Sequence, residues 1–99
     1  MRPKQYRKIC GSPESRYFKP EGVPSDGLKE LLITMDEYEA IRLADLEGMY
    51  QEEAACSMGI SRQTFGRIIE SAHLKIADAI VNLKVIHIEG GRVHMDGKI

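Results

Sequence analysis

The most informative part of this 99-residue chain reads Gln51-Glu52-Glu53-Ala54-Ala55-Cys56-Ser57-Met58-Gly59-Ile60-Ser61-Arg62-Gln63-Thr64-Phe65-Gly66-Arg67-Ile68-Ile69. Two steeply crossing helices require small and apolar residues at fixed places. Ala55 allows close approach of the helices, and Gly59 suits the turn because glycine adopts a left-handed backbone conformation without steric cost. Ser61 can cap the second helix through its side-chain oxygen. Apolar contacts between the helices are assigned to Ile60, Phe65 and Ile68. The spacing predicts a helix-turn-helix.

Helical patterns continue on both sides of this segment. The first helix of the pair is predicted over 51–58, and the second runs from after Ser61 to Asn82, since apolar residues keep a spacing of three to four. An earlier helix begins with a capping box of Thr34 and Glu37 and ends near Glu47. Its expected buried stripe is Tyr38, Ile41, Ala44 and Leu46. Its acids (Asp36, Glu37, Glu39, Asp45 and Glu47) are expected to form mostly a solvated face.

The two ends of the chain have other patterns. Residues 1–30 hold all four prolines and show no helical or strand period, which predicts an extended basic arm and a loop. Residues 31–33 predict a short strand. Residues 84–99 predict a β-hairpin around Gly90-Gly91 that pairs Ile88 with Val93 and Ile86 with Met95.

These patterns together predict a mainly α fold in three parts. Residues 1–30 form the arm and loop, and residues 31–83 form a three-helix helix-turn-helix domain with its recognition helix at about 61–82. Residues 84–99 form the hairpin, a packing or dimerisation element, because an isolated hairpin is marginal in water.

Charge is distributed unevenly along the chain, although the formal net charge is only −1. Residues 1–20 carry a net +5, residues 21–60 a net −8 and residues 61–99 a net +2. Basic charge therefore lies on the arm and from the recognition helix onward, the asymmetry that a small DNA-binding protein needs.

No apolar run is long enough to span a membrane, and no secretory signal is present. With only two cysteines in unrelated contexts, we expect a reducing cytoplasm.

Exposed polar residues at the start of the recognition helix are the candidate DNA contacts. Arginine offers two donors to guanine, and glutamine matches the edge of adenine. Arg62, Gln63 and Arg67 are therefore expected to read bases, while Ser61 and Thr64 contact the phosphate backbone. Gly66 costs about 1 kcal/mol of helix stability relative to alanine, and close approach of its backbone to DNA would explain it. The arm adds Arg2, Lys4, Arg7 and Lys8 as backbone or minor-groove contacts.

Other chemistry finds little support in the sequence. No nucleophile or phosphate-binding loop accompanies the acids, so we expect neither an enzyme nor a cofactor. His73, His87 and His94 lack zinc-ligand spacing, and no metal site is predicted. Cys56 is expected to be a small, partly buried residue. Cys10 lies in a basic segment that can lower a thiol pKa, so a metal- or redox-responsive role stays open.

The chain resembles a family of small, uncharacterised prokaryotic proteins regarded as predicted DNA-binding proteins. The resemblance covers nearly the whole chain. It is carried by Arg2-Pro3, Cys10, Pro13-Glu14, Phe18, Pro20, Asp36-Glu37-Tyr38-Glu39, Ile41-Arg42-Leu43, Leu46-Glu47-Gly48, Gln51-Glu52-Glu53-Ala54-Ala55, Ser61-Arg62-Gln63-Thr64-Phe65 and Ile88-Glu89-Gly90-Gly91. The family's helix-turn-helix is similar to the promoter-reading fourth region of sigma factors, which implies double-stranded DNA as partner.

The sequence therefore favours a cytoplasmic transcriptional regulator that binds double-stranded DNA. A homodimer is expected, because one recognition helix buries too little surface for high specificity. The alternatives are a sigma-like module that contacts the transcription machinery and a regulator that responds to metal or redox state through Cys10.

Overall fold

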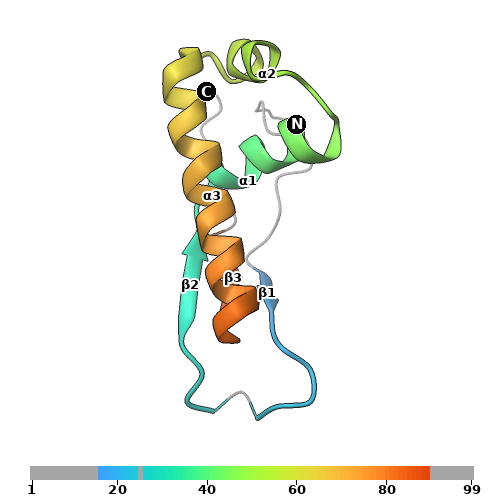
Figure 1. The fold of residues 1–99 in the computed structure, drawn as a ribbon, viewed down its shortest axis with the longest axis vertical. Helices are drawn as coiled ribbons and strands as arrows, with labels where there is room; N and C mark the ends of the chain where they lie inside the picture. Colours follow the sequence, from blue (N-terminus) through green and yellow to red (C-terminus); the bar gives the residue numbers. More distant parts are fainter. Residues whose placement is uncertain (1–15, 25, 90–99) are drawn as a thin grey trace, which may run out of the picture.

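A computed structural model describes residues 16–24 and 26–89. Helices predominate and a small sheet lies beside them (Figure 1). The elements are β1 (Arg16–Phe18), β2 (Glu30–Ile33), α1 (Met35–Ile41), the π-helical segment η1 (Arg42–Leu46), α2 (Gln51–Met58), α3 (Arg62–Asn82) and β3 (Val85–Ile88). The N-terminal half of α3 packs against α1 and α2, and its C-terminal half lies along the sheet (Figure 1).

The predicted capping box at the start of α1 is confirmed. The Glu37 N–H donates to Thr34 Oγ1 (3.2 Å), and the Thr34 N–H donates to Glu37 Oε1 (2.9 Å). The predicted buried stripe is partly wrong: Ala40 and Leu43 are buried, whereas Leu46 is 77% exposed. The cause is η1, in which the Glu47 N–H donates to Arg42 O (2.9 Å). A π-turn adds a residue to the helix and so rotates every later side chain away from the 3.6-residue pattern.

The turn between α2 and α3 forms as its residue types predict. Gly59 has φ 72°, and its N–H donates to Cys56 O while the Ile60 N–H donates to Ala55 O, both at 3.0 Å. These two bonds make a Schellman motif, which a left-handed residue closes. Ser61 caps α3, since its Oγ accepts the Thr64 N–H (3.0 Å). The predicted bounds of both helices, 51–58 and 62–82, are confirmed.

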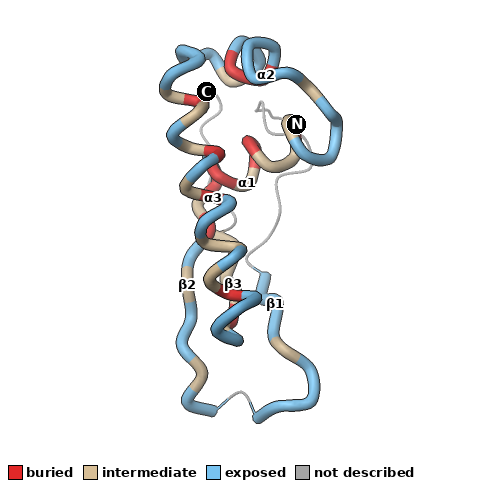
Figure 2. Tube along the Cα trace, viewed as in Figure 1, coloured by how far each residue is buried: buried red, intermediate tan, exposed pale blue. Residues whose placement is uncertain are grey.

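The core lies where α1, α2 and α3 meet (Figure 2). Phe65 is fully buried at its centre, and Ala54 and Ala55 of α2 are small enough to let the helices close around it. Its buried members are Ala40, Leu43, Ala54, Ala55, Phe65 and Ile69. Farther along α3, Ala72 and Ala79 are buried, but Ile80 and Leu83 are exposed despite their helical spacing with the core residues. The buried face of the last turn is therefore narrow and is formed by Ala79.

The sheet has the order β1-β3-β2, in which the strand within the predicted hairpin segment pairs with two earlier strands. β3 is the central strand: Ile86 lies opposite Phe18 of the antiparallel β1 and opposite Leu31 of the parallel β2. Both edges of β3 are thus paired along 86–88. The predicted partners Val93 and Met95 and the turn Gly90-Gly91 lie outside the described residues. Alternation of apolar and polar residues predicts that a strand exists, but it does not determine which strands pair with it.

A second difference lies in the predicted loop of residues 1–30. Residues 16–18 form β1, which is too short to show a two-residue period in the sequence. Residues 31–33 do form a strand, as predicted. The two ends of the described chain therefore meet in one sheet.

Candidate nucleic-acid interface

The predicted recognition residues lie in and just before the first two turns of α3, at exposed or half-buried positions. Phe65 and Ile69 point into the core and so fix the rotation of the helix. Gln63 and Arg67 lie on the opposite side of the helix and face away from the core, and Arg62 is exposed at the first position of the helix. Two arginines and a glutamine are thus presented by a helix whose position is set by buried contacts.

Hydroxyl groups organise the start of this helix. Ser61 Oγ accepts the Thr64 N–H and donates to Thr64 Oγ1 (2.9 Å). Thr64 Oγ1 is the acceptor in that second bond, so its own proton remains to be donated to an anion such as a phosphate oxygen. The arrangement assigns Ser61 to capping and Thr64 to the outward contact.

Gly66 is not required by the internal packing. A Cβ added at this position stands 3.6 Å from Gln51 Oε1, which is an ordinary van der Waals contact. Its φ lies outside the left-handed range that would favour glycine. Neither packing nor backbone conformation within the described residues therefore requires glycine at this half-buried position.

The predicted solvated acidic face is confirmed for Asp36, Asp45 and Glu47, which are exposed, but Glu37 and Glu39 are buried. Glu37 is only 6% exposed: Ser71 Oγ donates to its Oε2 (2.6 Å), and Lys75 Nζ donates to its Oε1 (2.9 Å). Glu39 is also buried and forms two hydrogen bonds of 2.9 Å with Arg42. The Glu37 contacts have no local sequence pattern, because their partners lie on α3, more than thirty residues away.

The environment of Glu37 shifts its ionisation. Burial raises the pKa of this carboxyl, but hydrogen bonds from Ser71, Thr34 and Lys75, together with the charge of Lys75, lower it by more. The net pKa lies below the ordinary value of 4.5. Glu37 is therefore a charged group that ties the start of α1 to the middle of α3.

The remaining candidate residues fall into two groups. Arg2, Lys4, Arg7, Lys8, Cys10 and His94 lie outside the described residues. Cys56 is described and is exposed on α2, so the prediction of a partly buried thiol is wrong. The wrong prediction arises because Cys56 follows the buried Ala54 and Ala55 and turns away from α3.

The described histidines have partners within the fold. His73 Nε2 lies 2.7 Å from Asp45 Oδ2, and His87 stacks on Tyr17 with ring centroids 4.3 Å apart. Over 16–24 and 26–89, no three His, Cys, Asp or Glu residues are grouped so that they could hold a metal ion. None of the helices in the same ranges has the length and apolar character of a membrane span.

Comparison with known proteins places the chain in a family. Residues 1–96 match the family model described as "Protein of unknown function DUF134". The chain is a member of the DUF134 family. Similar relatives include a UPF0251 protein of Prosthecochloris aestuarii, 58% identical over 93% of this chain, and one of Caldanaerobacter subterraneus subsp. tengcongensis, 52% identical over 98%. A UPF0251 protein of Chlorobaculum tepidum is 53% identical over 93% of the chain.

These relatives differ in length from the chain. It spans 59% of the Prosthecochloris relative, 60% of the Chlorobaculum relative and 82% of the Caldanaerobacter relative. No solved structure gives a significant match to this DUF134 member.

Proposed function

We propose that α2, the Gly59 turn and α3 form a helix-turn-helix that binds double-stranded DNA, and that the protein is a cytoplasmic transcriptional regulator. One observation carries the proposal: Gln63 and Arg67 face away from the buried Phe65, and Arg62 is exposed at the first position of the same helix. A helix presented in this way fits the major groove. The proposed resemblance to the fourth region of sigma factors agrees with this role.

The side chains divide by chemistry into two kinds of contact. Arg62, Gln63 and Arg67 read base edges, because their donors and acceptors match guanine and adenine. Thr64 contacts a phosphate oxygen, and the basic arm (Arg2, Lys4, Arg7 and Lys8) supplies further phosphate contacts. The active form is a homodimer on a two-fold operator, since one recognition helix buries too little surface for a specific complex.

The experiment that tests this proposal is selection of bound fragments from a random duplex library. The selected duplex is then titrated by fluorescence anisotropy at two salt concentrations. The proposal expects a two-fold sequence motif and affinity that falls steeply with salt, because each neutralised phosphate releases counterions. Absence of enrichment, with equally weak binding to every duplex, would contradict sequence-specific DNA binding.

Substitution of Arg67 tests the direct contact. Arg67→Ala is expected to weaken specific binding by about 1–3 kcal/mol while leaving binding to random duplex nearly unchanged, because a base contact carries the sequence information. Lys29→Ala is the matched control: it removes one exposed positive charge just before β2, away from the start of α3. An equal loss on specific and random duplexes would show that Arg67 contacts phosphate instead.

A protein-interaction module of the transcription machinery is the second candidate. Leu46 at the end of η1 and Tyr50 just before α2 are 77% and 80% exposed, and the exposed Glu47 lies between them in the sequence. An acidic surface with exposed apolar side chains suits a protein partner better than DNA. A metal- or redox-responsive role of Cys10 stays a prediction, for which Cys10→Ser is the test.

A further inference from the structure

The C-terminal half of α3 carries an apolar stripe that the fold does not cover. Leu74 and Val81 are 71% and 76% exposed, and Ala77 between them is also exposed. We call Leu74, Ala77 and Val81 the α3 stripe. Ile80, 68% exposed, lies beside it. Single exposed apolar residues are common on proteins, but a continuous row on one helix marks an interaction surface.

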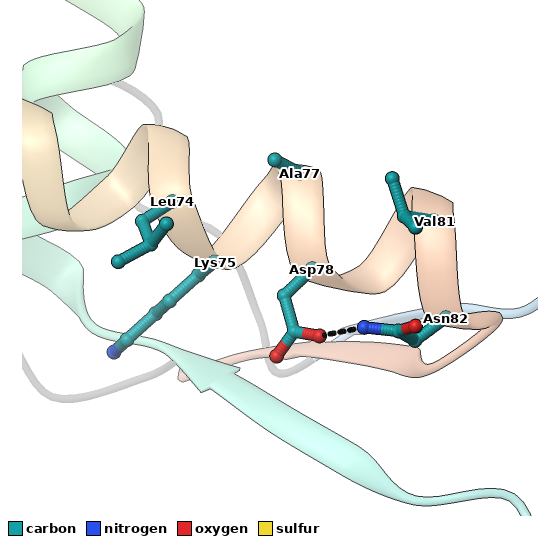
Figure 3. Close-up of a pocket in the computed structure, with 6 residues that line it drawn as sticks. All are labelled: Leu74, Lys75, Ala77, Asp78, Val81 and Asn82. Carbon is teal, nitrogen blue, oxygen red and sulfur yellow. Dashed lines mark hydrogen bonds between the residues drawn. The ribbon is translucent and has the colours of Figure 1, made fainter.

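The α3 stripe borders a shallow hollow of about 500 Å³ (Figure 3). Four of its lining residues are Leu74, Ala77, Asp78 and Val81. They stand at positions i, i+3, i+4 and i+7 of the helix, the spacing that forms a hole for a side chain of a second packed helix. The small side chain of Ala77 lets another backbone come close. The surface is therefore shaped to accept a helix.

The charged residues beside the hollow are already paired within the chain. Lys75 Nζ donates to Leu32 O (2.7 Å) and to Glu37 Oε1 (2.9 Å). Asp78 accepts from Asn82 Nδ2 (2.6 Å) and from Lys84 Nζ (2.8 Å). Figure 3 shows the bond between Asp78 and Asn82, with Lys75 extended toward the strand. A partner that covers the stripe leaves no unpaired charge there, so it needs an apolar face rather than a complementary charge.

We propose that a second copy of this chain docks on the α3 stripe, so that the two α3 helices cross in a parallel sense near Ala77. The same stripe supplies both the hole and the side chains that fill it, as a two-fold interface requires. The direction of the crossing rests on the proposed function. Arg67, Leu74 and Val81 follow one another at intervals of seven residues on one face, so the DNA-reading surface and the stripe face the same way.

The parallel crossing has a clear geometric result. The N-terminal halves of the two α3 helices diverge from the contact, and their recognition surfaces face the space between them. One duplex fits in that space, as it does in dimers whose basic helices fork from a zipper. An antiparallel pair would point the two recognition surfaces in opposite directions and could not present both to one duplex.

The size of the contact sets its strength. One helix-to-helix crossing buries less than the roughly 800 Å² per partner that stable complexes bury. The free dimer is therefore weak, with a dissociation constant on the order of micromolar or higher, and binding to a two-fold operator strengthens it because both copies are then held together.

Sedimentation equilibrium without DNA tests the surface. The wild-type protein is expected to self-associate, and Val81→Glu is expected to weaken association by about tenfold or more, since it places a charge in the contact. Leu46→Glu is the matched control: it alters an equally exposed leucine outside the stripe and leaves association unchanged. Circular dichroism checks that both variants fold. Wild-type protein that stays monomeric near millimolar concentration, or equal effects of the two variants, would overturn the proposal.

Disulfide cross-linking tests the direction. In a Cys10→Ser, Cys56→Ser background, Leu74→Cys and Val81→Cys are each expected to cross-link to their own copies, because a parallel crossing places equal positions opposite each other. Cross-linking only in a mixture of the two variants would overturn the parallel arrangement. Neither measurement contains DNA, so failure of the dimer and failure of DNA binding are distinguishable.

Discussion

At the scale of single residues, Gly66 separates the needs of the fold from those of the proposed DNA contact. Glycine weakens a helix, and the space around this position accepts a Cβ. The fold alone would therefore favour alanine here. A glycine that the protein does not need for packing is best explained by something that approaches from outside.

Gly66→Ala is expected to raise the free energy of unfolding by about 1 kcal/mol and to weaken binding to the selected duplex. The first effect follows from helix propensity, and the second from the methyl group that then lies between the backbone and the DNA. Thermal melting and anisotropy titration measure the two quantities. Unchanged affinity in the more stable variant would contradict close approach of the Gly66 backbone to DNA.

Glu37→Gln is expected to lower stability by about 1–3 kcal/mol near neutral pH, because it disturbs a buried network with Ser71 and Lys75. The folded-state pKa of Glu37 is lowered, so the stabilisation is present above the ordinary value of 4.5 and is lost as the pH falls through the folded pKa. The gap between wild type and variant should therefore shrink in acid.

Urea unfolding at neutral pH and below pH 4.5 measures that gap. The exposed Glu70→Gln serves as control and should change stability little at either pH. A gap that is constant or larger in acid would show that the carboxylate does not stabilise the fold by its charge.

At the scale of elements, local signals made α2, the turn and α3 predictable. Gly59 and Ser61 act through their own backbone and their nearest neighbours, so residue type alone gave the helix bounds. The candidate DNA surface could be predicted for the same reason, since buried Phe65 and Ile69 fix which residues face outward. By contrast, η1 has no local signal, and it moved Leu46 out of the predicted stripe.

Gly59→Ala is expected to destabilise the protein by about 1–2 kcal/mol, the cost of a left-handed conformation for a residue with a Cβ. Nothing lies within 4 Å of the added Cβ, so the cost is conformational rather than steric contact. Gly66→Ala, seven residues later, should change the free energy of unfolding in the opposite direction. The same substitution at two positions of one protein thus serves as its own control. Denaturant unfolding of both variants checks the pair; equal signs would contradict the assignment of Gly59 as the left-handed helix end.

At the scale of the whole molecule, contacts between segments distant in the chain could not be predicted from the sequence. The pairing of β3 with β1 and β2, and the burial of Glu37 against α3, both join residues more than thirty positions apart. Hydrophobic pattern shows which face of a strand or helix is buried but does not name the partner.

Val85→Ala tests whether the sheet and the helices unfold as one unit. Val85 is buried on the central strand next to the end of α3, so the truncation is expected to cost about 1–3 kcal/mol. Unfolding is followed by far-ultraviolet circular dichroism and by tyrosine fluorescence, and the transition midpoints from the two probes should shift by the same amount. Val23→Ala, at an exposed position outside the α3 stripe, is the control and should change stability by less than about 0.5 kcal/mol. Separate transitions for the two probes would show that the sheet melts independently.

The strand order β1-β3-β2 also has a consequence for the time course of folding. During synthesis, β1 and β2 leave the ribosome early, but the strand that belongs between them comes after all three helices. α1, α2 and the first turns of α3 can therefore assemble around Phe65 while both outer strands still lack a neighbour. Closure of the sheet waits for residues 85–88, and until then the nascent chain exposes two unpaired strands to whatever else is being made nearby.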